Sequence, residues 1–192
     1  MDTTFEAPLK AVGSILEDAN QYVGIVVIGG TALKLRGIVS RFTRDVDVIA
    51  LRTTPPGQTR SIGRPDPLPA ALVHAVARVA RDFGLPPDWL NTGPASQWDT
   101  GLPSGFADRV EWRAFGGLEV GLSGRIDLIF LKLYAAADDV GPTSVHYQDL
   151  LALRPTEAEL QAAAAWVRGQ DPSAGFAISL EGVLEHARRD LA

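Results

Sequence analysis

Residues 22–51 constrain the fold more than any other part of the sequence. Residues 22–28, YVGIVVI, form a β-branched run that is apolar on both faces, as expected of a strand buried in a sheet. Gly29-Gly30 ends this run, and good helix formers follow it. Residues 45–51, DVDVIAL, then alternate acidic and aliphatic side chains before becoming apolar, which indicates a second strand. The region predicts a strand, a glycine turn, a helix and another strand.

The rest of the sequence predicts a small sheet with helices around it, and then helices alone. Periodic or capped segments predict helices at residues 9–20, 68–83, 126–137, 144–153, 156–168 and 178–191. Residues 109–120 predict a hairpin and residues 53–67, rich in proline, glycine and arginine, predict a loop. Residues 85–108 show no clear period, and such a long irregular segment is either functional or a sign of misassigned elements. We expect an α+β fold, with a mixed sheet and flanking helices in residues 1–122 and a helical part, residues 123–192, packed on that core.

Composition narrows the class of protein. The 192 residues include no cysteine, which excludes disulfides and thiolate metal sites. The N-terminus shows no signal peptide and no apolar stretch is long enough to cross a bilayer, so we expect a cytoplasmic protein with no membrane partner. The net charge of −5 argues against general electrostatic capture of nucleic acid, although arginines crowd residues 36–52.

Asp45 and Asp47 are the residues best suited to chemistry. Side chains two apart on a strand point the same way, so both carboxylates project from one face. Two such carboxylates repel each other unless a cation lies between them, and Mg²⁺ suits the pair because it takes carboxylate and phosphate oxygens. The Gly29-Gly30 turn lets backbone amides approach a phosphate at a helix start, with the Thr31 hydroxyl beside them. This order predicts a nucleotide site with Mg²⁺, or Mn²⁺ in its place.

Each motif alone is weaker evidence. A Gly-Gly pair is usually only a turn, and an Asp-x-Asp pair is most often a solvated edge or a helix cap. Arg41 and Arg44 either clamp phosphate or only balance the paired acids. The order of the motifs between two apolar strands is what favours nucleotide chemistry.

The same residues resemble a known family. Residues 29–33, GGTAL, followed by residues 41–47, RFTRDVD, are similar to the signature of the polymerase-beta-like nucleotidyltransferases, and more narrowly of the AbiEii and DUF6036 groups. Residues 126–135, IDLIFLKLYA, resemble a Lys-Leu-x-Ala helix of those groups, and residues 146–153, HYQDLLAL, resemble the element after it. The resemblance spans residues 22–153 and implies a polymerase-beta nucleotidyltransferase core.

The resemblance implies roles for individual residues. The two aspartates would hold the metal, and the glycine turn with Thr31 would hold the triphosphate. A third carboxylate ligand usually comes from a later strand, where Glu111 is the first candidate and Glu119 the second. Lys132 would reach the triphosphate, and Asp149 matches the second acid of the last motif.

Several of these residues also have structural explanations, which stay open. Lys132 can be a surface lysine with a buried stem. Asp149 can be an acid that caps a helix or forms an ion pair, and we expect His146, which replaces the first acid of its motif, to be structural. Trp89, in a DWLN segment that resembles a loop of the family, and Trp98 either stack on a base or anchor an irregular loop.

The implied reaction is attack of an acceptor hydroxyl on the α-phosphate of an NTP, with Glu111 or Asp47 assisting deprotonation. AbiEii-like and MenT-like relatives are toxins of toxin–antitoxin pairs, and the MenT-like ones extend the 3′ end of tRNA. The resemblance therefore implies a toxin that modifies the tRNA 3′ end and is neutralised by an antitoxin protein. Transfer to a small molecule or to a protein, and an inactive domain that only binds a partner, are the alternatives.

Overall fold

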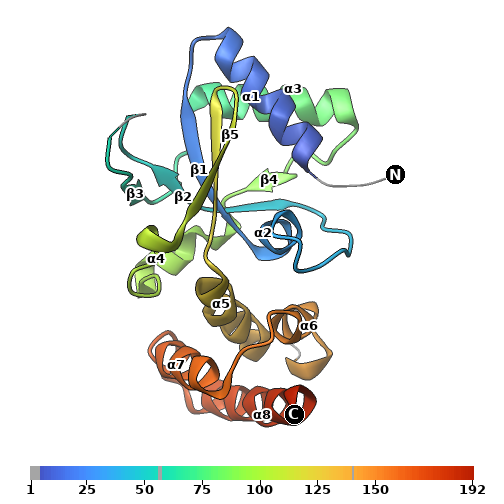
Figure 1. The fold of residues 1–192 in the computed structure, drawn as a ribbon, viewed down its shortest axis with the longest axis vertical. Helices are drawn as coiled ribbons and strands as arrows, with labels where there is room; N and C mark the ends of the chain where they lie inside the picture. The colour runs from blue at the N-terminus through green and yellow to red at the C-terminus, as the bar shows by residue number, and fades with distance from the viewer. Residues whose placement is uncertain (1–4, 56–57, 140) are drawn as a thin grey trace. The chain divides into compact units, whose positions relative to one another are not determined.

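The computed structural model describes residues 5–55, 58–139 and 141–192. The chain divides into two compact units, drawn in Figure 1: Met1–Asp99 with Gly105–Ser123, and Thr100–Ser104 with Gly124–Ala192. Within the described residues, every strand belongs to the first unit, and the second is built from helices. The fold is therefore mixed α+β, with a mixed sheet, which is consistent with a nucleotidyltransferase fold.

The strands of the described residues form one six-stranded sheet. They are β1 (Val23–Ile28), β2 (Val46–Arg52), β3 (Ile62–Gly63), β4 (Leu90–Asn91), β5 (Glu111–Phe115) and β6 (Leu118–Leu122). The order is β3-β2-β1-β6-β5, and β4 also pairs with β2. β1 is antiparallel to β2 and parallel to β6, so it lies in the middle of the sheet, where its continuous apolar run is buried.

Helices of the first unit support the sheet. They are α1 (Glu6–Asp18), α2 (Gly29–Leu35), α3 (Ala70–Phe83) and α4 (Gln97–Thr100). α1 and α3 lie side by side, and α2 packs against β1 and β2 (Figure 1). The helix predicted at residues 68–83 is present as α3, and its apolar side chains at helical spacing, Leu72, Val76 and Val79, are buried. Phe83 continues the same spacing but is exposed because it lies in the last turn, just before the left-handed Gly84 that ends the helix.

Residues 85–108 contain β4 and several short helices, where the sequence showed no clear period. Trp89 is fully buried, stacks on Phe5 at 5.5 Å between ring centroids, and donates its indole N–H to the Val76 carbonyl at 3.2 Å. The Trp98 indole donates to the Ile49 carbonyl at 2.5 Å. Both tryptophans therefore anchor this segment to the core, because their N–H groups are used by backbone carbonyls.

The second unit confirms the predicted C-terminal helices. They are α5 (Arg125–Asp138), α6 (Val145–Ala152), α7 (Glu157–Arg168) and α8 (Ala174–Leu191). α5 packs against the other three. A capping box of Thr156 and Glu159 begins α7, the helix predicted at residues 156–168. The Arg125 guanidinium, bonded to Glu159 at 2.6 Å, holds the pKa of that carboxyl below its usual value. Across the described residues, no helix combines the length and the apolar character that a bilayer span requires.

Candidate functional site

The glycine turn is shaped around one carboxylate. β1 ends at Ile28, and α2 begins at Gly29 without an intervening loop. Gly29 has a φ of +68°, which favours glycine, and a Cβ added there would lie 2.5 Å from Oδ2 of Asp47. Any side chain at this position would therefore strain the backbone and displace the carboxylate. The Gly29 turn and Asp47 form one structural unit.

Strand pairing brings the two aspartates to this turn. In the β1–β2 ladder, Ile28 lies opposite Asp47. Asp45 directly precedes β2, which starts at Val46. Val46 and Val48 are buried, while Asp45 and Asp47 are half-buried, and this alternation is typical of side chains on opposite faces of a strand. The burial pattern therefore places both acids on the same side of β2.

Thr31 holds the start of β2 in place. Thr31 is buried, and its hydroxyl donates to the Asp45 carbonyl at 2.6 Å. The Thr31 and Thr43 hydroxyl oxygens lie 3.4 Å apart, and Thr43 is also buried. Since the Thr31 proton is directed at the Asp45 backbone, this residue positions the acids in the observed structure. The triphosphate contact predicted for its hydroxyl stays a prediction.

Arg41 is the predicted phosphate-binding arginine that the structure brings to the turn. Its Nη2 atom would lie 3.1 Å from a Cβ added at Gly30, and its Nη1 donates to the Phe42 carbonyl at 3.2 Å. The guanidinium therefore lies over Gly30, a position that a larger residue would obstruct. Arg44, the other predicted arginine, is exposed on the same segment, as is Phe42.

Asn91 is a site residue that sequence reasoning missed. β4 runs parallel to β2 and pairs Asn91 with Asp47. The Asn91 amide nitrogen donates to Oδ1 of Asp47 at 3.4 Å, and its carbonyl oxygen accepts from the Gly93 backbone N–H at 2.8 Å. A two-residue strand is too short to show periodicity in the sequence. The DWLN segment was the available signal, but it did not indicate this contact.

The structure does not bring the predicted third carboxylate to the aspartates. Glu111 lies on β5, and β6 and β1 separate it from β2, a distance of about 14 Å at the usual strand spacing. Glu111 instead forms a 2.8 Å ion pair with Arg36. Glu119 pairs with Gly24 in the β1–β6 ladder. Gly24 precedes Ile28 by four residues, which is about 13 Å along the strand. Considering the described residues only, no group of three or more acidic, histidine or cysteine side chains could hold a metal.

The donor set at the aspartates still fits a hard divalent cation. Asp45 and Asp47 offer carboxylate oxygens, which Mg²⁺ prefers. Mg²⁺ is commonly bound through one or two carboxylates, with waters and substrate phosphates completing its octahedron. Two carboxylates are therefore sufficient for Mg²⁺ when a nucleotide supplies further oxygens.

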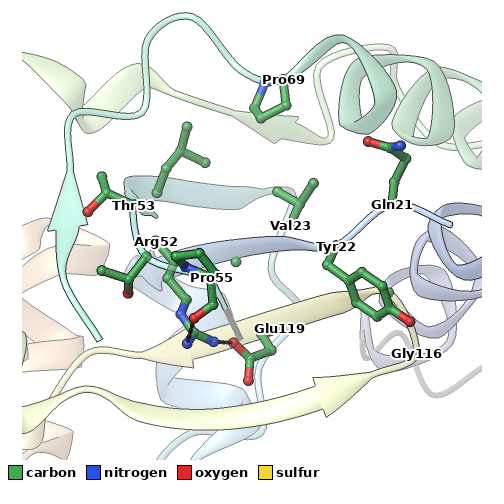
Figure 2. A pocket seen from close by; sticks show the side chains of 13 residues that line it. Gln21, Tyr22, Val23, Arg52, Thr53, Pro55, Pro69, Gly116 and Glu119 are labelled. Atoms are coloured by element: carbon green, nitrogen blue, oxygen red, sulfur yellow. Dashed lines mark hydrogen bonds and ion pairs between the residues drawn. The ribbon is translucent and has the colours of Figure 1, made fainter. Parts of the chain in front are cut away.

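A pocket of about 320 Å³ lies at the opposite end of β1 (Figure 2). One row of residues crosses β2, β1 and β6. Gly24 pairs with Glu119 of β6, and Arg52 of β2 lies next to the Ile25–Leu51 pair, on the side of Gly24. A Cβ at Gly24 would lie 2.6 Å from the Arg52 Cβ, so the glycine lets Arg52 cross β1 and bond to Glu119, as the dashed line in Figure 2 shows. Glu119 therefore belongs to an ion pair in the wall of this pocket, which Tyr22 borders.

Lys132 and Asp149 form a buried ion pair within the second unit. Lys132 on α5 is 5% exposed, which excludes the surface lysine that the sequence allowed. Its Nζ lies 2.8 Å from Oδ2 of Asp149 on α6 and 3.4 Å from Nδ1 of His146. Asp149 is 1% exposed, so the lysine balances its charge inside the folded unit.

A protein-family model matches this chain. The model of a family described as nucleotidyltransferase of unknown function, DUF6036, matches residues 8–140. The chain belongs to this family. The DUF6036 match includes the glycine turn, both aspartates, Asn91 and Lys132, whereas His146 and Asp149 lie beyond its end. Membership indicates transfer of a nucleoside monophosphate, with an NTP as donor. No curated protein matches the chain, and neither does any solved structure.

Proposed function

We propose that this chain, on a polymerase-beta nucleotidyltransferase core, transfers a nucleoside monophosphate from an NTP to an acceptor hydroxyl. The observation that carries the proposal is the Asp47 carboxylate lying against Gly29, where β1 passes directly into α2. The Arg41 guanidinium lies over the next residue of the same turn. A carboxylate for a cation and an arginine for phosphate at one glycine turn support nucleotide chemistry.

The aspartates of this site are assigned to the cation, and its arginines and backbone amides to phosphate. Asp45 and Asp47 would hold Mg²⁺ or Mn²⁺, which when bound would supply positive charge against the charge that builds up on the phosphate oxygens. Arg41 and Arg44 present planar guanidinium groups that match phosphate oxygens in pairs. The first amides of α2 have no acceptor within the helix and can donate to phosphate.

In the proposed reaction, the acceptor oxygen forms a bond to the α-phosphorus and the bond to pyrophosphate breaks. The hydroxyl proton passes to a base, for which Asp47 is the candidate, since Glu111 lies on the edge strand β5 and pairs with Arg36. The catalytic roles of Lys132 and Asp149 stay predictions from the resemblance.

We propose the tRNA 3′ end as the acceptor, and a toxin neutralised by an antitoxin protein as the biological role. Besides the resemblance, the support is the segment before Asp45. Phe42 is 60% exposed there, between Arg41 and the exposed Arg44. An exposed aromatic ring flanked by arginines suits a single-stranded RNA end, because bases stack on the ring and phosphates pair with the cations.

The test is incubation of the purified chain with each of the four α-³²P-labelled NTPs and Mg²⁺, in parallel with total RNA, with added protein and with small-molecule acceptors. Label on tRNA that requires Mg²⁺ and is lost in Asp47→Ala supports the proposal. Label on added protein or on a small molecule instead rejects the tRNA acceptor and retains nucleotidyl transfer. Growth arrest on expression, relieved by Asp47→Ala, tests the toxin role.

A second candidate is an inactive nucleotidyltransferase-fold module that only binds a partner. The observation that favours it is the missing third acid: Glu111 lies three strands from β2. The same incubation separates the two candidates. An inactive module binds NTP without transferring label to any acceptor.

A further inference from the structure

β4 pairs with β2 and places Asn91 beside Asp47. β3 pairs with the end of β2 at Leu51 and Arg52, whereas β4 pairs with its beginning. The β4 register places Asn91 directly opposite Asp47, and the Asn91 amide nitrogen lies 3.4 Å from Oδ1. The Gly29 turn faces the other carboxylate oxygen, Oδ2. Asp47 therefore has the amide at one oxygen and the glycine turn at the other.

The orientation of the Asn91 amide follows from its other contact. Its Oδ1 atom accepts the Gly93 backbone N–H at 2.8 Å. A flipped amide would turn its NH₂ toward the Gly93 N–H, donor against donor, and its oxygen toward the Asp47 carboxylate. The hydrogen bonds thus leave only the NH₂ group for Asp47. Trp89 and Trp98, one on each side of Asn91 in the sequence, hold the segment to α3 and β2 through their indole N–H groups.

A neutral amide at this place has an electrostatic consequence. A carboxylate at position 91 would lie close to Asp47 and repel it unless a cation lay between them. The amide instead donates to the ionised carboxylate and orients it. Asp45 and Asp47 are then the two carboxylates of the site, and Mg²⁺ is commonly bound through one or two carboxylates.

We propose that Asn91 is the positioning residue of the cation site: it holds Asp47 through Oδ1 and limits the site to one divalent cation. This inference rests on the proposed function, because it takes Asp47 as a cation ligand. Asn91 acts through Asp47 and contacts neither NTP nor acceptor. Replacement of Asn91 by an acid would turn a two-carboxylate site into a three-carboxylate site.

The test measures Mn²⁺ binding to the nucleotide-free chain by electron paramagnetic resonance, in which free Mn²⁺ gives the signal. We expect one Mn²⁺ per wild-type chain. Asn91→Ala should weaken binding about tenfold, as loss of a partner that orients a metal ligand does. Asn91→Asp keeps the acceptor for Gly93 and adds a ligand, so it should bind Mn²⁺ about tenfold more tightly. Its melting temperature should fall without metal and recover with Mn²⁺.

If Asn91 only stabilises its own segment, the variants should show a different set of Mn²⁺ affinities. Asn91→Asp would then bind Mn²⁺ like the wild type, since the Gly93 contact is preserved. Ser96→Asp is the matched control, because it adds the same charge at an exposed position of the same segment. Equal tightening by Ser96→Asp would show a general charge effect and overturn the inference, as would two Asp47-dependent Mn²⁺ ions in the wild type.

Failure of the inference and failure of the proposed function are distinguishable. If Asp47→Ala binds Mn²⁺ like the wild type, the cation site itself is wrong, and the proposed function falls with it. If Asp47→Ala loses Mn²⁺ while Asn91→Ala and Asn91→Asp both keep the wild-type affinity, only the role of Asn91 is rejected.

Discussion

Asp47 and Asp149 are the same residue type in opposite surroundings. Asp47 is half-buried, with a neutral amide at one oxygen and a glycine turn at the other. Asp149 is 1% exposed and lies 2.8 Å from the Lys132 ammonium. The family match includes the first residue and ends before the second.

The difference shows what each carboxylate contributes to the protein. A buried charge must be balanced inside the chain, because its desolvation is otherwise uncompensated. Lys132 supplies that balance for Asp149. A half-buried carboxylate beside a glycine turn keeps an approach for a cation and its phosphate ligands. Loss of Asp47 should therefore affect chemistry first, and loss of Asp149 should affect stability first.

The largest effect should come from Asp47→Ala. We expect nucleotide transfer to fall at least about a thousandfold, because the cation loses a ligand that contributes several kcal/mol to the transition state. The α-³²P-NTP assay measures this, with circular dichroism as the check on folding. Asp18→Ala, which removes an exposed acid on α1, is the control and should keep full activity. Wild-type turnover by Asp47→Ala would contradict the mechanism.

Asp149→Ala should destabilise the chain by about 3 to 5 kcal/mol, because it leaves the Lys132 ammonium buried without its carboxylate. Urea unfolding measures the change. The double variant Lys132→Met with Asp149→Leu removes both charges and should recover most of the lost stability. If the single and double variants are equally unstable, the ion pair is not what Asp149 supplies.

The effects of Gly29→Ala and Gly37→Ala on Mn²⁺ binding test whether the close approach of Gly29 to Asp47 matters. Both glycines have left-handed φ values, +68° and +72°, so alanine should cost about 1 to 2 kcal/mol at either position. A Cβ meets Asp47 only at Gly29, since nothing lies within 4 Å of one at Gly37. We expect Gly29→Ala alone to weaken Mn²⁺ binding. Equal Mn²⁺ affinities of the two variants would show that the close approach to Asp47 is not needed for the cation.

The smallest effect should come from Thr156→Ala, which removes the cap of α7. Loss of such a cap costs about 1 kcal/mol of stability, which urea unfolding can measure. Nucleotide transfer per folded molecule should stay unchanged, as expected of a residue that acts only on a helix end. A loss of transfer without a loss of stability would mean that the α7 cap takes part in the chemistry.

Local patterns predicted most of the regular structure. The apolar run of β1, the alternation of β2 and the hairpin of β5 and β6 are all present. They could be predicted because the burial and the period of a segment follow from the pattern of its consecutive residues. The Thr156 capping box is also local and is present. β3 and β4 were not predicted, since each has two residues and depends on pairing with β2.

The sequence by itself determined the glycine turn and the Asp-Val-Asp strand, whose order along the chain indicated nucleotide chemistry. Only the tertiary structure decided which charged and polar groups meet. It paired Glu111 with Arg36, Lys132 with Asp149 and Asn91 with Asp47. The physical reason is that cross-strand and interhelical neighbours depend on the register between segments far apart in the chain, whereas periodicity records only which face of its own segment each residue occupies.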